Sequence, residues 1–292
     1  MESIQILELF KAVLFGIVEG ITEWLPISST GHMILLNEFI KLNVSEAFWS
    51  MFEVVIQLGA ILAVVVVFWH NIWPFGRRNN PQPLAKNGPL SFVKKDIIKL
   101  WIKIIIACIP AAVIGMAFND TFEALFYNFQ TVAIFLIIFG IAFIVIENKY
   151  KGKTARVATV EDLTWKLCLI IGLFQLIAAI FPGTSRSGAT IVGALLIGVS
   201  RVAAAEFTFY LAIPVMFGAS LLKLAKFGLD FTPNEVAILI VGMVVAFIVS
   251  IIVIKFLMSY IKKHDFKVFG WYRIVLGILV LVYFGVKTLV LG

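Results

Sequence analysis

Six long apolar segments constrain this chain more than any other feature of its sequence. They lie at about residues 48–69, 100–118, 131–146, 205–225, 235–257 and 268–290. A helix needs about 20 residues to cross the hydrocarbon core of a bilayer, and these segments are close to that length. Charged residues make up only 14% of the chain, against about 25% in soluble domains. We therefore predict an all-α polytopic membrane protein with six transmembrane helices.

Residues 4–40 form a further apolar segment that a polar turn interrupts. Glu19 and Glu23 stand four residues apart, which places them on one face of a helix. Pro26 and the run SSTGH at residues 28–32 follow before apolar sequence resumes. Neither arm is comfortable as a full span, because two glutamates interrupt the first, at about residues 4–25, and the second, at about residues 32–40, is short. The interruption indicates a re-entrant helical hairpin, whose irregular backbone must be covered by protein or by a water-filled cavity.

Residues 167–199 repeat this layout in the second half of the chain. A polar residue, Gln175, stands inside an apolar helix that reaches Pro182, and the turn GTSRSG follows at residues 183–188. The sequence therefore predicts a second re-entrant hairpin. It has the same kinds of residue as the first in the same order, although few residues are identical.

The order of the predicted elements gives two copies of one unit, a hairpin followed by three spans. The copies cover about residues 1–147 and 165–292 of a single membrane domain. Because three crossings separate them, the second copy has inverted topology, and the two polar turns are expected to meet near the bilayer midplane. We expect the two turns to form one site.

Basic residues gather in three connections, and their distribution predicts the orientation. Residues 70–99 hold six Lys or Arg, residues 147–166 hold five and residues 255–267 hold four, whereas residues 118–130 hold none. Basic loops stay on the cytoplasmic side, so both termini and the mouth of the site are predicted to face outward. The net charge of +7 then reflects topology, and we expect no nucleic-acid partner.

The second turn has the composition of an anion site. Arg186 offers two parallel donors to phosphate oxygens, and Gly183 lets the backbone approach a ligand. A helix follows, and the amides at a helix N-terminus favour an anion. A cation inside the membrane is costly, so a functional role is the default. The neighbouring residues predicted to bind the same anion are Thr184, Ser185 and Ser187.

The first turn carries groups for catalysis. Glu19 and Glu23 are candidates to hold a divalent cation, Mg²⁺ or Ca²⁺, or to serve as an acid and a base. His32 is a candidate base, acid or nucleophile, and Ser29 offers a hydroxyl beside it. The other two hydroxyls, predicted to bind substrate, are Ser28 and Thr30.

Polar residues in neighbouring spans are weaker candidates. Glu53 with Gln57, and Arg201 with Glu206, form two pairs that are candidates to support the catalytic groups, and Gln57 is also a predicted substrate contact. For Arg201 the alternative is an anchor at the membrane interface.

The first turn resembles a motif of a known family. The run EGITEWLPISSTGH at residues 19–32 is similar to the glutamate-rich first motif of the undecaprenyl-diphosphate phosphatase family, of the integral-membrane, bacitracin-resistance type. The run PGTSRSG at residues 182–188 resembles the second motif of that family. The similarity extends over essentially the whole chain, including FEVVIQLG at 52–59 and GVSRVAAAE at 198–206.

The resemblance implies hydrolysis of undecaprenyl diphosphate to undecaprenyl phosphate and inorganic phosphate in the bacterial plasma (inner) membrane. This reaction recycles the lipid carrier for cell-wall synthesis and is linked to bacitracin resistance. By the family pattern, the catalytic set is Glu19, Glu23, Ser29, His32 and Arg186, with a divalent metal. The nucleophile stays open between Ser29, His32 and an activated water. A flippase or transporter of a polyprenyl phosphate is the competing interpretation, because inverted repeats with broken helices are also a transporter architecture. Whether the chain forms a homodimer is left open.

Overall fold

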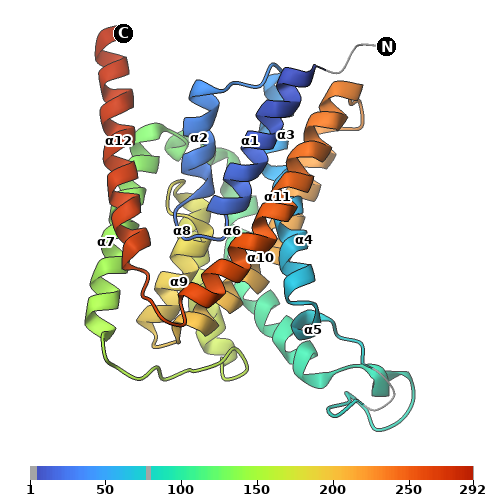
Figure 1. The fold of residues 1–292 in the computed structure, drawn as a ribbon. Helices are drawn as coiled ribbons and strands as arrows, with labels where there is room; N and C mark the ends of the chain where they lie inside the picture. Colours follow the sequence, from blue (N-terminus) through green and yellow to red (C-terminus); the bar gives the residue numbers. More distant parts are fainter. Residues whose placement is uncertain (1–4, 77–79, 292) are drawn as a thin grey trace.

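The structure, a computed structural model, describes residues 5–76 and 80–291, and within them the chain is helical, with isolated bridges and no strand. Figure 1 shows the arrangement of the helices. Their bounds are α1 Ile6–Thr22, α2 Ser29–Phe39, α3 Glu46–Val55, α4 Gln57–Val67, α5 Trp69–Ile72, the 3-10 helix η1 Pro89–Phe92, α6 Lys95–Phe126, α7 Phe129–Tyr150, α8 Trp165–Ile180, α9 Arg186–Leu196, α10 Arg201–Phe227, α11 Pro233–Tyr260 and α12 Lys267–Leu291. Arg77 and Arg78, which entered the charge count, lie outside the described residues.

The predicted membrane spans are confirmed as helices. In the described part of the chain, six segments are long and apolar enough to cross a bilayer: Glu46–Val67, Lys95–Gly115, Phe129–Tyr150, Arg201–Phe227, Pro233–Tyr260 and Lys267–Val290. The chain is thus an all-α polytopic membrane protein. The first span differs from a continuous helix, because α3 ends at Val55 and α4 begins at Gln57. The break falls beside the polar residues that the sequence singled out in this span.

The two interrupted segments each form a pair of short helices. The chain reverses between α1 and α2 at residues 23–28, which we call the first loop, and between α8 and α9 at residues 181–185, the second loop. In Figure 1 the first pair fills the upper part of the molecule and the second pair the lower part, and both loops reach its middle. α9 is enclosed by other helices, with every residue from Ser187 to Leu195 buried. The second loop therefore lies in the interior.

Small residues set how closely the helices cross. A Cβ at Gly16 would lie 2.7 Å from the carbonyl oxygen of Gly242, where α1 crosses α11. A Cβ at Gly172 would lie 2.2 Å from the carbonyl oxygen of Ala107, where α8 crosses α6. Without side chains at these points the backbones approach closely, as is common between membrane helices. α1 therefore packs on α11 much as α8 packs on α6.

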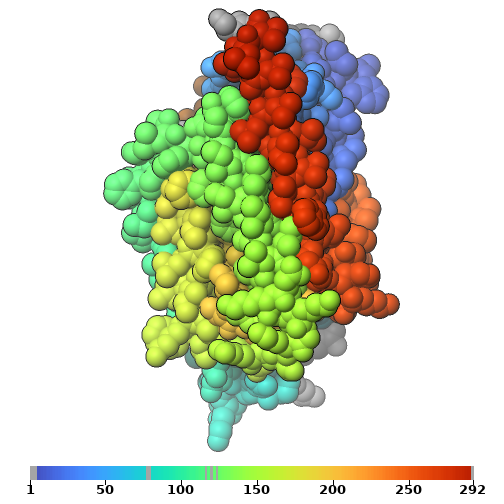
Figure 2. Space-filling view, turned by 90° about the vertical axis from the view of Figure 1, so that its left-hand side faces the viewer, coloured from blue at the N-terminus to red at the C-terminus, as the bar shows by residue number. Residues whose placement is uncertain are grey.

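α7 and α12 cross each other through a reciprocal glycine contact. A Cβ at Gly140 would lie 2.7 Å from the carbonyl oxygen of Gly270, and a Cβ at Gly270 would lie 2.7 Å from the carbonyl oxygen of Gly140. Figure 2 shows α12 lying along α7 on one face of the molecule. α1 begins and α12 ends at the same end of the molecule, and the connections from α5 to α6 and from α7 to α8 lie at the opposite end (Figure 1).

Candidate functional site

The two loops have the same local backbone. Ser28 has a φ of 75° and Ser185 a φ of 67°, and they are the only non-glycine residues with positive φ in the described part of the chain. The Ser28 hydroxyl accepts a hydrogen bond from the amide of Gly31 at 3.3 Å, and the Ser185 hydroxyl accepts one from the amide of Gly188 at 3.2 Å. Such strained residues cost about 1–3 kcal/mol each and cluster at functional sites. Each loop thus ends in a capped helix N-terminus.

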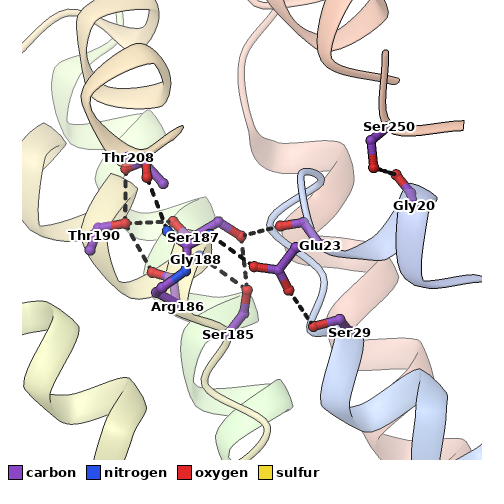
Figure 3. A network of polar contacts seen from close by, with 10 residues as sticks. All are labelled: Gly20, Glu23, Ser29, Ser185, Arg186, Ser187, Gly188, Thr190, Thr208 and Ser250. Atoms are coloured by element: carbon purple, nitrogen blue, oxygen red, sulfur yellow. Dashed lines mark hydrogen bonds and ion pairs between the residues drawn. The ribbon is translucent and has the colours of Figure 1, made fainter. Parts of the chain in front are cut away.

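An ion pair joins the loops. Arg186 Nη2 donates to Glu23 Oε1 at 2.8 Å, and Arg186 Nη1 donates to the carbonyl of Thr208 on α10 at 3.0 Å. The other carboxylate oxygen of Glu23 accepts from the Ser29 hydroxyl at 2.6 Å, and the Ser187 hydroxyl donates to the Glu23 carbonyl at 3.1 Å. Figure 3 shows these contacts converging on Glu23 from both halves of the chain. The structure thus brings Glu23, Ser29, Ser187 and Arg186 into direct contact.

Several polar atoms around this ion pair are buried without a partner. Both carboxylate oxygens of Glu19, both polar atoms of the Gln175 amide, the Thr184 hydroxyl and Nε of Arg186 make no hydrogen bond within the described residues. Glu19 and Gln175 occupy matching places, each seven residues before its proline. A buried polar group without a partner costs about 1–3 kcal/mol, so such groups gathered in one place indicate a site for a polar ligand.

His32 lies beside this network but is bonded elsewhere. Its Nδ1 donates to the carbonyl of Ser28 at 2.7 Å, since a carbonyl only accepts. Its Nε2 is therefore free to accept a hydrogen bond from the hydroxyl of Tyr272 on α12, at 2.7 Å, and the two rings are stacked. Among the contacts of the described residues, no hydrogen bond joins the imidazole to Ser29, Glu23 or Arg186. The structure thus places the catalytic candidate His32 next to the site with both ring nitrogens engaged.

The predicted pairing of Arg201 with Glu206 is wrong. Arg201 forms a bidentate contact with the buried carboxylate of Glu147 on α7, with Nη2 at 2.5 Å from Oε2. Glu206 instead accepts hydrogen bonds from Asn71, at 3.4 Å, and from Tyr210. Both acids are polar partners available at the same end of α10, and sequence spacing does not decide which of them faces the arginine.

The remaining candidates lie around the loops. Glu53 accepts a hydrogen bond from the Tyr127 hydroxyl at 3.2 Å, and Gln57 is the first residue of α4, at the break in that span. Thr30 is half-buried in the first turn of α2. Gly183 has a φ of 89°, and a Cβ there would lie 2.3 Å from the Val132 carbonyl oxygen on α7. Glycine at 183 is thus required by packing, and its contact with substrate stays a prediction.

One arginine near the loops was missed. Arg273 on α12 is fully buried and donates to carbonyl groups of both loops. The signal was present in the sequence, because Arg273 lies inside the apolar segment 268–290, far from Lys287 near the end of that segment, and an intramembrane cation is a functional candidate by default.

The acidic residues fit a divalent cation in part. Glu19 presents two buried oxygens with no partner within the described residues, which suits a hard cation. Glu23 is the nearby carboxylate, but both of its oxygens already bond to Arg186 and Ser29. Among the described residues, no group of three or more His, Cys, Asp or Glu side chains is placed to hold a metal ion. Glu19, with Glu23 nearby, offers the one or two carboxylates through which Mg²⁺ usually binds, the rest of its shell being phosphates and water.

A buried arginine and glutamate thus meet between two broken helix pairs of a multi-pass membrane protein. Comparison with known families agrees, since the family described as bacitracin resistance protein BacA matches residues 12–279. The chain belongs to this family.

Curated relatives match nearly the whole chain. The undecaprenyl-diphosphatase of Desulfitobacterium hafniense is 65% identical over 285 residues, covering 98% of this chain and 99% of the relative. Undecaprenyl-diphosphatase 1 of Clostridium acetobutylicum is 64% identical, covering 97% and 99%. The undecaprenyl-diphosphatase of Enterococcus faecalis is 61% identical, covering 96% and 98%.

Proposed function

We propose that this chain hydrolyses undecaprenyl diphosphate to undecaprenyl phosphate and inorganic phosphate. The observation that carries the proposal is the buried contact of Arg186 with Glu23 and of Glu23 with Ser29, which unites an anion clamp, a carboxylate and a hydroxyl. Relatives that carry this activity in their name match the chain from end to end. The reaction returns the lipid carrier to cell-wall synthesis, and the family that the chain belongs to is described by bacitracin resistance.

We further propose that the two helix pairs are re-entrant hairpins of an inverted repeat. Three features support it: the matching positive φ of Ser28 and Ser185, the equivalent crossings at Gly16 and Gly172, and the reciprocal contact of α7 with α12. A two-fold axis in the membrane plane would relate α1 to α8, α11 to α6 and α7 to α12. The two loops would then lie near the midplane.

The orientation follows from the basic connections. With these on the cytoplasmic side of the bacterial inner membrane, the α1–α2 pair enters and leaves from outside. The substrate headgroup then reaches the site from the outer side, while its polyprenyl tail stays along apolar helix faces.

Substrate binding would begin at the second loop. Arg186 takes phosphoryl oxygens of the diphosphate, together with amides at the N-terminus of α9. The phosphoryl group competes with Glu23 for the guanidinium, which is 2.8 Å from the carboxylate in the described structure. Binding therefore frees Glu23 to act as a base.

Ser29 is the nucleophile that this geometry favours. A hydroxyl within hydrogen-bond reach of a base is the usual arrangement of an activated nucleophile, and Ser29 lies 2.6 Å from Glu23. The Ser29 oxygen bonds to the terminal phosphorus as the bridging P–O bond breaks, and the Ser29 proton passes through Glu23 to the departing undecaprenyl phosphate. Water then attacks the phosphoserine, Glu23 takes a proton from that water, and the Ser29 oxygen regains a proton.

Charge stabilisation is the other part of catalysis, because phosphoryl transfer depends mainly on positioning and neutralisation of the oxygens. Glu19, with Glu23, would hold a divalent cation, which would add positive charge beside the phosphates. Arg186 supplies the positive charge that comes from the protein itself.

The test is phosphate release from undecaprenyl diphosphate by the purified protein in detergent, with and without EDTA. We expect release that stops on chelation and returns with Mg²⁺, and a Glu19→Gln variant that stays below wild type at every Mg²⁺ concentration. After an acid quench, labelled phosphate should be found on the peptide that contains Ser29.

Other outcomes separate the parts of the proposal. Release without label after the acid quench would replace Ser29 by an activated water or by His32, because phosphohistidine loses its phosphate in acid. Release that survives EDTA would remove the metal. No release from monodisperse, folded protein would contradict the phosphatase and favour the flippase or transporter.

A further inference from the structure

Arg273 of α12 is the most deeply placed cation near the site. Its side chain is fully buried. Nη1 donates to the carbonyl of Pro26 in the first loop at 3.0 Å, and Nη2 donates to the carbonyls of Gly183 and Thr184 in the second loop at 2.8 and 2.7 Å. One guanidinium thus bonds to both loops.

Among the residues that the structure describes, no carboxylate forms an ion pair with Arg273. Every hydrogen bond of Arg273 within the described residues goes to a backbone carbonyl, with two longer ones, at 3.4 Å, to Phe135 and Leu136 on α7. The guanidinium carbon also lies 5.9 Å from the ring centre of Phe139. Burying a charge without an opposite charge costs free energy in a membrane, so we expect Arg273 to have a structural or functional role that offsets this cost.

The need is visible in the loops. A chain that leaves a helix inside the membrane exposes carbonyl groups that no water satisfies, and each unsatisfied group costs several kcal/mol. Pro26, Gly183 and Thr184 stand in those irregular stretches, and Arg273 satisfies all three carbonyls at once.

The same bonds hold the catalytic groups in register. Pro26 follows Glu23 by three residues, and Thr184 precedes Arg186 by two. Because Arg273 fixes Pro26 against Thr184, it limits how far the loop that carries Glu23 can move from the start of α9, which carries Arg186. Displacements of about 1 Å at such groups can cost a hundredfold in rate.

We propose that Arg273 is a positioning residue that ties the two loops together and sets the geometry of the Glu23–Arg186 contact. This inference rests on the proposed phosphatase function for its kinetic readout. Lysine cannot replace arginine in this role, because the planar guanidinium carries five donors in a fixed fork, whereas an ammonium is a point charge with three.

The first test compares Arg273→Lys with Lys287→Gln, which removes a cation from the same helix, where Lys287 pairs with Glu38. Arg186 remains in place to bind phosphate, so Arg273→Lys should lower kcat about a hundredfold and change KM less than threefold. A purely fold-supporting residue would instead reduce the yield of folded protein and leave both constants normal in the folded fraction. Lys287→Gln should keep both constants within twofold of wild type.

A second variant displaces the guanidinium without removing it. A Cβ at Gly188 would lie 2.9 Å from Arg273 Nη1, so Gly188→Ala should push the side chain off its carbonyls and lower kcat about tenfold. In the Arg273→Lys background the same change should add little, because the shorter side chain no longer fills that space. If Arg273→Lys does not fold, the single variant Gly188→Ala, which keeps the guanidinium, decides the matter.

Hydrogen exchange followed by mass spectrometry tests the same point without activity. In Arg273→Lys, exchange should rise in both loops together and stay at wild-type levels in α11; in Lys287→Gln, both loops should stay unchanged. Wild-type kcat in folded Arg273→Lys or in Gly188→Ala, a raised KM with normal kcat, or unchanged exchange in the loops would each overturn the proposal. If wild-type protein releases no phosphate, the phosphatase function fails, and the exchange data alone judge the role of Arg273.

Discussion

The first and second loops have one backbone and two chemistries. Each is entered from an apolar helix and left through a serine with positive φ that caps the next helix. The residue after the cap, which begins the next helix, differs: it is Ser29 in α2 and Arg186 in α9. Three residues before its proline the first loop also offers Glu23, whereas the residue three before Pro182 is the apolar Ala179.

This difference indicates a division of labour. The cap positions maintain the loops, while the positions beside them carry a hydroxyl and carboxylate on one side and a cation on the other. Neither loop alone holds a complete site, so activity requires both to be held against each other. Substitutions at the cap positions should therefore affect stability, whereas substitutions at the positions next to them should affect activity.

The largest expected effect is at Arg186. Arg186→Ala removes the anion clamp and should lower kcat/KM about a thousandfold or more, because arginines that neutralise a transferring phosphoryl group contribute on that scale. Arg186→Lys should recover only part of the loss, since the fork geometry is missing. Phosphate release from undecaprenyl diphosphate measures both.

A control is needed because Arg186→Ala leaves the buried carboxylate of Glu23 without its cation. The double variant Glu23→Gln with Arg186→Ala removes that charge, and it should be as inactive as Arg186→Ala but more stable. Activity within tenfold of wild type in either variant contradicts the division of labour.

The next effect concerns the helix crossings that make the two halves alike. Gly172→Ala should destabilise the protein by about 2–3 kcal/mol and Gly16→Ala by about 1–2 kcal/mol, because each Cβ would meet a backbone carbonyl and the closer approach is at Gly172. Gly218→Ala on α10 is the matched control, since nothing lies within 4 Å of a Cβ there. Thermal unfolding in detergent, monitored by circular dichroism, measures the order. Equal stability of all three variants would contradict the prediction that close glycine contacts stabilise both crossings.

A smaller effect is expected at the two caps. Ser28→Ala and Ser185→Ala should each lower stability by about 1 kcal/mol, the usual loss for a helix cap, and should do so to within about 0.5 kcal/mol of each other. Ser28→Gly and Ser185→Gly should cost less, because glycine tolerates the positive φ. The same unfolding measurement applies. If only one loop loses stability, the two caps contribute differently to stability although their backbone conformations match.

Much of this architecture could be predicted from the sequence. The six spans follow from apolar length, and the two loops follow from proline, glycine and hydroxyl residues inside apolar segments, which leave few alternatives for a chain in lipid. The meeting of Arg186 with Glu23 was predicted from the inverted order of the elements. These features depend on local composition and on topology, both of which a single sequence records.

Choice of partner was harder to predict. Arg201 forms an ion pair with Glu147 and not with Glu206. His32 bonds to Tyr272, and Arg273 donates to backbone carbonyls and not to an acid. Each depends on which helix faces cross and at what angle, which residue spacing within one segment does not encode. Carbonyl acceptors are invisible to a search for charged partners, so a cation bound only by backbone is easily overlooked.

The smallest expected effect comes from an asymmetry between the loops. His32 in the first turn of α2 bonds to Tyr272, whereas Ala189 holds the equivalent place in α9 and has no such side chain. Tyr272→Phe removes one hydrogen bond worth about 0.5–1.5 kcal/mol, so kcat should change about two- to tenfold if His32 serves the reaction from this position.

Tyr283→Phe, further along α12 and packed against Phe39, is the matched control and should leave kcat unchanged. The variant His32→Gln separates hydrogen bonding from proton transfer, because glutamine can keep the bond to the Ser28 carbonyl but cannot transfer a proton as imidazole does. A hundredfold loss in His32→Gln with only a small effect of Tyr272→Phe would show that the imidazole leaves Tyr272 during turnover. Small effects of both would confine the chemistry to Glu23, Ser29 and Arg186, and would make the first loop the source of the base as well as of the hydroxyl.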